Sequence, residues 1–297
     1  MASASKKIVV CGGNGFLGTR ICKAAVARGW SVTSISRSGA PTWSAVSSSP
    51  DPPPWASSIT WARANILDPP TYAAHLASAD AVVHTMGILL EADYKGVLQG
   101  RESPLSGLRR AFSAHKAGSA TNPLDNNGGA AGGGGPAIAP AERDGQLTYE
   151  LMNRDSAILL AREAAAQHVG TFVFLSAAAG APVLPARYIS TKREAEATIA
   201  EAFPAMRSVF VRAPFMWDAS RAFTVPLAAA TGAASLVNSA VGGRLTWLMG
   251  AGGVKPLKAD LVGEAVVEAI ENGVAKGPVE VPQIEELATK HWRRNML

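Results

Sequence analysis

The chain has 297 residues, of which 47% are hydrophobic and 17% are charged, and its formal net charge is +5. This length is enough for one large α/β domain with an appended region, and the low charged fraction suggests an apolar surface. Because no stripe of basic and aromatic residues accompanies the modest positive charge, we expect an anionic cofactor or an anionic lipid surface as partner, and no nucleic acid. The two cysteines and five histidines form no metal-binding pattern, so no metal site is expected.

The N-terminal segment predicts a strand, a glycine turn and a helix in direct succession. An apolar strand at 8–11 leads into Gly12, Gly15 and Gly18, and a helical pattern continues through Ile21. Glycines in this context permit a tight turn and a close backbone approach, and the helix N-terminus presents free N–H groups to a phosphate. A glycine turn also serves at ordinary strand-to-helix corners, but the agreement of strand, turn and helix favours a site for a dinucleotide pyrophosphate.

A second predicted strand, at 31–36, ends beside Arg37. NAD-binding chains carry an acidic residue for the ribose at this place, roughly 20 residues past the glycines. Residues 1–50 contain no Asp or Glu, whereas Ser36 and Ser38 flank Arg37 as hydrogen-bond donors for a phosphate. We therefore expect NADP(H) as the cofactor. The alternative is that Arg37 is a solvated surface charge.

The same acid-free segment has the charge signature of a mitochondrial transit peptide, with abundant Ser and six basic residues in 1–50. Only seven residues precede the first predicted apolar strand, so either the folded unit doubles as its own import signal or a presequence has been removed. No uninterrupted apolar span in the sequence reaches the length needed to cross a membrane.

Predicted strands and helices alternate along the rest of the chain. After a Ser/Pro-rich loop at 38–58, expected to be irregular, the pattern predicts strands at 59–63, 81–84, 171–175 and 208–212, and helices at 71–76, 147–167, 188–202 and, as the last one, 258–272. Such alternation predicts a Rossmann-like α/β fold with a doubly wound parallel sheet. The expected organisation is an NADP(H)-binding domain at 1–215 followed by a small substrate-cleft or membrane-facing region at 216–297.

Two segments between the fourth and fifth predicted strands interrupt this alternation. The Gly/Ala-rich stretch at about 117–143 is expected to be disordered. The stretch at 95–116 carries five basic residues and one acid, and it forms either a solvated face or a contact for a membrane or a partner.

Tyr188 and Lys192, in the helix predicted at 188–202, are candidates for acid/base chemistry. They stand at i and i+4 and therefore share one helical face. A nearby cation favours the phenolate, so we expect Lys192 to lower the pKa of Tyr188 toward the working range of general acid/base catalysis.

These features resemble the short-chain dehydrogenase/reductases over nearly the whole chain, including the helix that contains Asn153. The segments 83–91, 148–153, 188–196 and 215–218 are similar to a fungal mitochondrial family of atypical members associated with coenzyme Q biosynthesis. That resemblance implies an NAD(P)H-binding oxidoreductase that handles a polyprenylated quinone intermediate or lipid. It also implies peripheral contact with the matrix side of the mitochondrial inner membrane, and partners in a ubiquinone-synthesis assembly. A more distant resemblance is to the NADPH-binding accessory subunit of respiratory complex I.

The resemblance further implies which residues contact the cofactor. They are Gly12, Gly15, Phe16, Leu17 and Gly18 at the pyrophosphate turn, Ser36, Arg37 and Ser38 at the ribose phosphate, Asn65 and Ile66 at the adenine, Met86 and Gly87 at its ribose, Tyr188 and Lys192, and Pro214 and Phe215 at the nicotinamide.

The chain also departs from the family pattern. Active relatives hold the substrate oxygen with a Ser or Thr just beyond the fifth strand, where this chain offers only Ser176, followed by three alanines; Asn65 also replaces the more usual Asp. Tyr188, Lys192 and Ser176 are the candidate catalytic residues. The alternative is a catalytically silent, nucleotide-loaded scaffold or accessory subunit of an inner-membrane assembly, either the coenzyme Q synthesis complex or complex I.

The stretch between Arg221 and Lys255 is almost free of charge, with Arg244 as its single charged residue. It forms either a buried helix pair over the substrate cleft or a surface that dips into a bilayer or receives a polyprenyl tail. Pro226 and Asn238 argue against a full membrane span, so any membrane contact is expected to be peripheral. Basic residues then available to anionic lipid are Lys255, Lys258, Lys290, Arg293 and Arg294.

Overall fold

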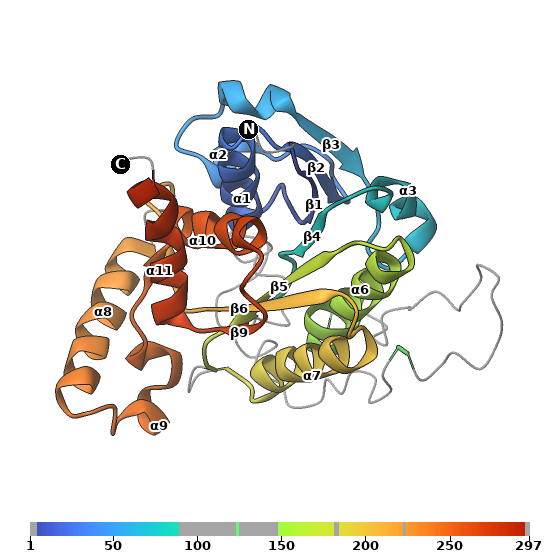
Figure 1. The fold of residues 1–297 in the computed structure, drawn as a ribbon. Coiled ribbons are helices and arrows are strands. Elements are labelled where there is room, and N and C mark those ends of the chain that lie inside the picture. The colour runs from blue at the N-terminus through green and yellow to red at the C-terminus, as the bar shows by residue number, and fades with distance from the viewer. Residues whose placement is uncertain (1–4, 89–122, 125–147, 181–183, 222–223, 295–297) are drawn as a thin grey trace, which may run out of the picture.

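The fold is built on one seven-stranded sheet with strand order β3-β2-β1-β4-β5-β6-β9 (Figure 1). The computed structural model describes residues 5–88, 123–124, 148–180, 184–221 and 224–294. The strands of this sheet are β1 Lys7–Cys11, β2 Ser31–Ser36, β3 Ile59–Arg63, β4 Ala81–His84, β5 Thr171–Ala177, β6 Arg207–Ala213 and β9 Gly277–Val279. Every pairing in it is parallel, which confirms the predicted Rossmann-like doubly wound fold.

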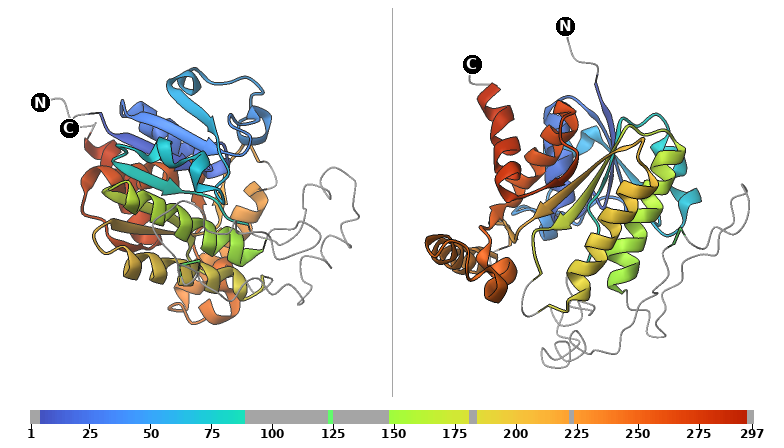
Figure 2. Two further views of the ribbon diagram at one scale, coloured as in Figure 1. Left: turned by 90° about the vertical axis from the view of Figure 1, so that its right-hand side faces the viewer. Right: turned by 60° about the horizontal axis from the view of Figure 1, so that its bottom comes forward.

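Helices cover both faces of this sheet. The helices and helical turns of the described residues are α1 Phe16–Ala27, α2 Trp43–Val46, η1 Pro54–Ser58, η2 Pro69–Thr71, α3 Ala73–Leu76, η3 Glu150–Asp155, α6 Ser156–Ala166, α7 Arg187–Ala202, α8 Thr224–Ala240, α9 Thr246–Met249, η4 Gly250–Gly253, α10 Ala259–Asn272 and α11 Val281–Arg294. The right-hand view of Figure 2 shows α6 and α7 on one face, with α10 and α11 on the other.

Strand β1 shows why both faces must be covered. Ile8 and Val10 pack into the core cluster that contains α1, α10 and α11, whereas Val9 and Cys11 pack into the cluster that contains α3, α6 and α7. All four side chains are buried. Because successive side chains of a strand point to opposite faces, an unbroken apolar run predicts this arrangement in a parallel sheet. The strand order reverses between β1 and β4, and in such sheets ligands bind at the carboxyl ends of the strands beside the reversal.

The loop at 38–58, expected to be irregular, contains the short helical elements α2 and η1. The expectation is wrong at these turns because tryptophans organise the segment. The ring of Trp43 lies 5.6 Å from that of Trp55 and 6.0 Å from that of Trp61, both in edge-to-face geometry. Such aromatic packing supplies a local core that a Ser/Pro-rich composition does not reveal.

The C-terminal region divides into two parts. After β6 the chain leaves the main sheet and forms a second, two-stranded sheet from β7 Met216–Trp217 and β8 Leu257–Lys258. It then returns to the main sheet, where β9 pairs with β6 from Val209↔Gly277 to Val211↔Val279. The expected boundary at 215 therefore does not separate the main sheet from the C-terminal region, and the helix expected at 258–272 is followed by α11. A three-residue strand containing Gly and Pro is too short to show a period of two in the sequence.

Two expectations fall largely outside the described residues. They are the disordered stretch at about 117–143, of which the structure describes only 123–124, and the basic stretch at 95–116. Among the helices that the structure does describe, none is both long and apolar enough to cross a bilayer. The described side chains also bring together no group of three His, Cys, Asp or Glu that could hold a metal ion.

Candidate functional site

The glycine turn between β1 and α1 is shaped to receive a phosphate. Gly12 has a φ of 79°, in the left-handed region that favours glycine. A Cβ at Gly18 would lie 2.1 Å from the Gly12 carbonyl oxygen, and a Cβ at Gly12 would lie 2.7 Å from Thr85 Oγ1. Helix α1 begins with Gly15 as its N-cap, and no side chain caps its first N–H groups. The turn thus leaves backbone donors at a positive helix end for an anion, which fits a dinucleotide pyrophosphate.

The end of β2 presents Arg37 to solvent beside this turn. Of its two neighbouring serines, Ser36 donates its hydroxyl to Gly39 O at 2.9 Å, so that proton is already used. Ser38 accepts a hydrogen bond from Asn14 Nδ2 at 2.7 Å, which leaves its own proton available and joins the end of β2 to the glycine turn. Arg37 and Ser38 therefore remain available to a ribose phosphate, whereas the Ser36 hydroxyl is engaged within the turn.

Arg63 is a second cation at this edge that the sequence did not single out. It is the last residue of β3 and pairs in register with Ser36. Its side chain is exposed, and a Cβ on Gly39 would lie 3.3 Å from Arg63 Cγ. The signal that could have identified Arg63 is the strand order. Because β3 lies beside β2, Arg63 at the end of β3 becomes a neighbour of Arg37, which follows β2.

The residues expected at the adenosine follow β3 and β4. Asn65 is exposed, and its Oδ1 accepts a hydrogen bond from Leu67 N at 3.3 Å, while Ile66 is buried. Met86 is brought to the glycine turn, because the Cys11 thiol donates to Met86 Sδ at 3.3 Å. The structure thus gathers the ends of β1, β2, β3 and β4 at one edge of the sheet, with the glycine turn among them.

Lys192 reaches this edge from α7. Its ammonium donates to Leu175 O at 2.9 Å and lies 5.0 Å from the centre of the Phe174 ring. A Cβ placed on Gly87 would lie 3.4 Å from Lys192 Nζ, so the lysine approaches the loop after β4 closely. Burial lowers the pKa of Lys192 from 10.5 to about 8, against the charge of Glu196, which raises it.

Tyr188, one turn before Lys192, does not behave as expected. Burial raises the pKa of the Tyr188 phenol to about 12, and the opposing charge comes from Arg193 rather than from Lys192. The expected lowering is therefore wrong for the protein as it stands, because loss of water around the phenol outweighs the nearby cation. The ring of Tyr188 packs edge-to-face on Tyr149 with 5.9 Å between the ring centres. The phenol stays protonated at neutral pH.

Asn153 is a site residue that the expected cofactor contacts did not include. The helix predicted at 147–167 opens with the π-helical turn η3, which carries Asn153 before α6 begins. Asn153 is fully buried; its Oδ1 accepts from Ile88 N at 2.9 Å and its Nδ2 donates to Ile88 O at 3.3 Å. It thereby holds the loop after β4, where Gly87 meets Lys192. Single π turns are frequent at functional sites, but their position is not visible in a helical repeat.

His84, at the end of β4, lies in the core beneath this loop. It is buried, and its Nε2 is 3.0 Å from Ser156 Oγ. Burial, followed by the charge of Lys192, lowers the pKa of His84 to about 3, so the ring is neutral at physiological pH. These contacts support a structural role for His84.

Ser176, a predicted catalytic residue, contacts Arg193 of α7. Its Oγ accepts a hydrogen bond from Arg193 Nη1 at 2.9 Å, and Arg193 Nη2 donates to Ala177 O at 2.7 Å. Arg193 also pairs with Glu196 at 2.6 Å, and Glu196 in turn pairs with Arg212. The described contacts thus place Ser176 beside a half-buried ion-pair cluster, and they include no hydrogen bond between Ser176 and Tyr188.

The segment after β6 contacts β8 and the N-terminal half of helix α1. Pro214 is buried, and Phe215 O accepts a hydrogen bond from Leu257 N at 3.1 Å, which ties the expected nicotinamide contacts to β8. Further on, Asp218 pairs with Arg20 of α1 at 2.9 Å, and Arg221 Cζ lies 4.1 Å from the centre of the Phe16 ring. These α1 contacts cover the first turn of the helix. Sequence reasoning missed them because both partners are distant along the chain.

Comparisons with known proteins identify a family and a relative of this chain. Residues 8–94 match the model of the NAD dependent epimerase/dehydratase family. MIOREX complex component 2 of Saccharomyces cerevisiae is 36% identical over 229 residues, which are 72% of this chain and 74% of the yeast protein.

Two solved structures show the same fold. The Bordetella bronchiseptica enzyme WbmH in complex with NAD+ aligns with a TM-score of 0.51 at 16% identity, covering 99% of this chain and 83% of that one. UDP-N-acetylglucosamine 4-epimerase from Bacillus cereus aligns with a TM-score of 0.51 at 12% identity, covering 95% and 83%. At such identities the likeness concerns the fold alone.

Proposed function

Because the chain belongs to the family of yeast MIOREX complex component 2, and its residues 8–94 match the NAD dependent epimerase/dehydratase family, we propose that it is an NADP(H)-binding oxidoreductase of mitochondrial ubiquinone synthesis. The observation that carries this proposal is the glycine turn with Arg37 beside it, in a segment without any acid. A guanidinium can neutralise a 2′-phosphate and bind it in a bidentate manner, whereas NAD recognition uses a carboxylate at this place.

The proposed reaction is hydride exchange with a carbonyl or quinone-ring carbon. The bound cofactor supplies or accepts the hydride. Tyr188, protonated because burial raises its pKa, gives its proton to the substrate oxygen that becomes a hydroxyl. Lys192 contributes a cation beside Gly87 and the loop after β4, where the cofactor riboses are expected.

Several observations support a mitochondrial assembly at a membrane. The yeast relative is named as a component of a complex, which favours protein partners for this chain as well. The acid-free, basic residues 1–50 favour mitochondrial import. Exposed apolar side chains on α8 favour peripheral contact with the matrix side of the inner membrane. Fusion of residues 1–40 to a reporter tests the import step, and a purely cytosolic reporter contradicts it.

The cofactor proposal is tested by titrating the full chain with NADPH and with NADH. We expect tighter binding of NADPH and expect Arg37→Ala to remove that preference, with a smaller loss for Arg63→Ala. Lys276→Ala is the matched control, because Lys276 is an exposed cation next to β9, at the opposite edge of the sheet. Tighter binding of NADH by the native protein contradicts the proposal.

A second candidate function is a catalytically silent scaffold that retains its nucleotide. It is favoured by the engagement of Ser176 with Arg193 and by the absence of any hydroxyl residue at 177–180. Tyr188→Phe distinguishes the two, since it should abolish quinone production only if the chemistry is required. The control is Tyr72→Phe. This substitution removes a hydroxyl group that is buried elsewhere in the core and has no hydrogen-bond partner among the described residues. Gly15→Asp should disturb either function, because it places an anion at the phosphate turn.

A further inference from the structure

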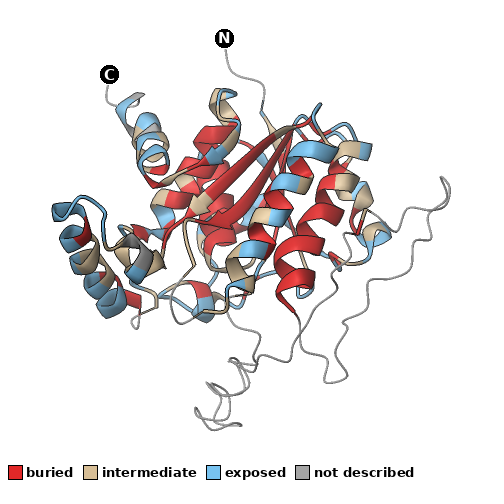
Figure 3. Ribbon diagram, turned by 90° about the horizontal axis from the view of Figure 1, so that it is seen from below, coloured by how far each residue is buried: buried red, intermediate tan, exposed pale blue. Residues whose placement is uncertain are grey.

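Helix α8 stands beside the body of the molecule and exposes an apolar surface. Figure 3 shows mostly exposed and half-buried residues along it, in contrast to the buried helices of the core. It carries no charged residue, and only Thr224, Ala228 and Asn238 are buried. Leu236 is 73% exposed and Leu248, in α9, is 54% exposed. Contiguous apolar exposure of this kind marks an interaction site in a soluble domain.

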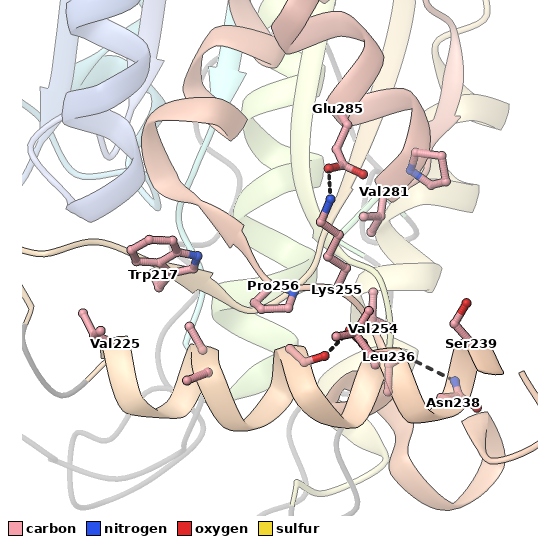
Figure 4. A pocket seen from close by; sticks show the side chains of 16 residues that line it. Trp217, Val225, Leu236, Asn238, Ser239, Val254, Lys255, Pro256, Val281 and Glu285 are labelled. Atoms are coloured by element: carbon pink, nitrogen blue, oxygen red, sulfur yellow. Dashed lines mark hydrogen bonds and ion pairs between the residues drawn. The ribbon is translucent and has the colours of Figure 1, made fainter. Parts of the chain in front are cut away.

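A cavity of about 840 Å³ lies between α8, the β7–β8 pair and the start of α11 (Figure 4). This volume falls within the range of small-molecule sites, about 300–1,000 Å³. None of the residues placed at the cofactor site lines it. The cavity therefore is not explained by nucleotide binding.

The cavity follows α8 for most of its length. Its lining on that helix runs from Val225 through Ala229, Gly232 and Ser235 to Ser239, the spacing of a single helical face. From the first to the last of these the helix rises about 21 Å at 1.5 Å per residue. Trp217 and Val225 lie at one end and Ser239 at the other, as Figure 4 shows. A volume of about 840 Å³ distributed along a helical face of this length suits an extended chain better than a compact ring.

Several polar groups of the cavity wall are hydrogen-bonded within the protein. Ser235 Oγ donates to Gly232 O at 2.8 Å, Asn238 Nδ2 donates to Gly253 O at 3.3 Å, and Asn238 Oδ1 accepts from Leu245 N at 3.0 Å. At the rim, Lys255 forms an ion pair with Glu285 of α11. An occupant thus needs few hydrogen bonds, and a hydrocarbon chain is favoured over a polar ligand, which would leave its own groups unpaired.

Charge around the cavity favours a lipid source for that chain. No Asp or Glu occurs from 219 to 259, a range that includes the cations Arg221, Arg244, Lys255 and Lys258. Arg244 is exposed between exposed Val241 and Leu248. Among the described residues that line the cavity, Glu285 is the only acid, and it is paired with Lys255. A surface that combines apolar side chains with an exposed cation such as Arg244 complements an anionic bilayer, from which a lipid chain can enter.

We propose that this cavity binds the long aliphatic chain of a lipid, prenyl or acyl, laid along α8 and drawn from a membrane surface at the α8–α9 face. One end of the bound lipid chain meets Trp217, which lies two residues past Phe215. A quinone ring attached to that end of a prenyl chain then lies on the side of the expected nicotinamide contacts. The choice of a prenyl chain within this class rests on the proposed function; the site itself rests on the cavity.

Gly232→Leu tests the site on the full chain. A Cβ at Gly232 would come no closer than 3.8 Å to Pro256 across the cavity, so a leucine there fills the space without a backbone clash. It also removes a glycine from a helix interior, which favours folding. Ala230→Leu is the matched control, because Ala230 is exposed, does not line the cavity and lies about 200° around the helix from Gly232.

The probe is cis-parinaric acid, an acyl chain whose fluorescence rises in an apolar site. Ubiquinone-2 with two prenyl units and ubiquinone-0 with none then serve as competitors. We expect probe binding by the native chain and Ala230→Leu, at least tenfold weaker binding by Gly232→Leu, unchanged NADPH affinity in all three, and displacement by ubiquinone-2 but not by ubiquinone-0.

Other outcomes have defined meanings. Probe binding without displacement by ubiquinone-2 keeps the aliphatic site and counts against the proposed quinone function. If the native protein does not bind NADPH more tightly than NADH, the proposed function is contradicted, whereas the proposal of an aliphatic site is unaffected. Equal probe binding by Gly232→Leu, equal displacement by ubiquinone-0, or a native dimer in light scattering that Gly232→Leu dissociates overturns the site.

Discussion

Replacement of Lys192 by Met should change the pH dependence of stability in one direction. Lys192 is 5% exposed, and its burial lowers its pKa from 10.5 to about 8. The folded protein therefore releases this proton near pH 8, while the unfolded chain keeps it until about pH 10.5. Between these values the unfolded state binds more protons, so the free energy of unfolding contributed by Lys192 rises with pH.

The size of the effect follows from the shift. A lowering from 10.5 to about 8, at about 1.4 kcal/mol per pKa unit, corresponds to roughly 3 kcal/mol. Below pH 8 this amount opposes folding of the native protein, and near pH 10.5 nearly all of it has disappeared. The hydrogen bond from Lys192 to Leu175 O is lost in the variant at every pH, so it adds a constant offset and does not enter the slope.

Urea denaturation of both proteins without nucleotide, at intervals from pH 7 to pH 10.5, measures the difference. The unfolding free energy of the native protein minus that of Lys192→Met should rise by about 3 kcal/mol across this range. Titration of Tyr188, the other lysines and the acids occurs in both proteins and cancels in the difference. A difference that stays constant, or that falls with pH, refutes the argument that Lys192 is buried with a lowered pKa.

Further substitutions test separate contacts. Gly18→Ala should abolish NADPH binding and cost about 1–3 kcal/mol of stability in urea denaturation, since its Cβ would lie 2.1 Å from Gly12 O; retained affinity contradicts the turn geometry. Glu268→Gln should lower the free energy of unfolding by about 1–3 kcal/mol, because fully buried Glu268 pairs with Arg28 at 3.4 Å. An unchanged urea midpoint would show that the other carboxylates around Arg28 are enough to balance its charge. Arg193→Gln should cost a similar amount, about 1–3 kcal/mol, by freeing carbonyls at the end of β5, while NADPH affinity stays within twofold of native; a large loss of affinity ties this cluster to the cofactor.

The local parts of the fold were predictable and the non-local parts were not. The strand at 8–11, the turn at Gly12 and the helix after it are defined within twenty residues by apolar pattern and glycine, and they were predicted correctly. The return of β9 to the sheet depends on pairing with β6, some seventy residues earlier, and no local pattern encodes it. The tryptophan cluster around Trp43 lies within one short segment, but its aromatic spacing follows neither a helical nor a strand period.

The site shows the same division. The presence of Arg37 at the end of a strand and the shared face of Tyr188 and Lys192 follow from spacing. The raised pKa of Tyr188 does not follow from spacing, because it depends on how far burial removes water from the phenol. The hydrogen bond between Arg193 and Ser176 does not follow from it either, because it depends on how α7 packs against β5. Burial and partners are properties of the packed molecule, and a motif specifies only the positions.

Lys192 also allows cofactor binding to be separated from catalysis. Its ammonium lies between Leu175 O and the loop at Gly87, where a bound dinucleotide is proposed to pass, so its charge should help to hold that anion in both candidate functions. Because the pKa of Lys192 is about 8, NADPH affinity of the native protein should fall as pH rises through 8, whether or not a reaction occurs. Lys192→Met should bind NADPH more weakly at pH 7 and without this step. Tyr188→Phe should keep the step, since the phenol, with a pKa of about 12, does not titrate there. Loss of the step in Tyr188→Phe would instead couple the two residues as one titrating unit, and the assignment of separate roles would fail.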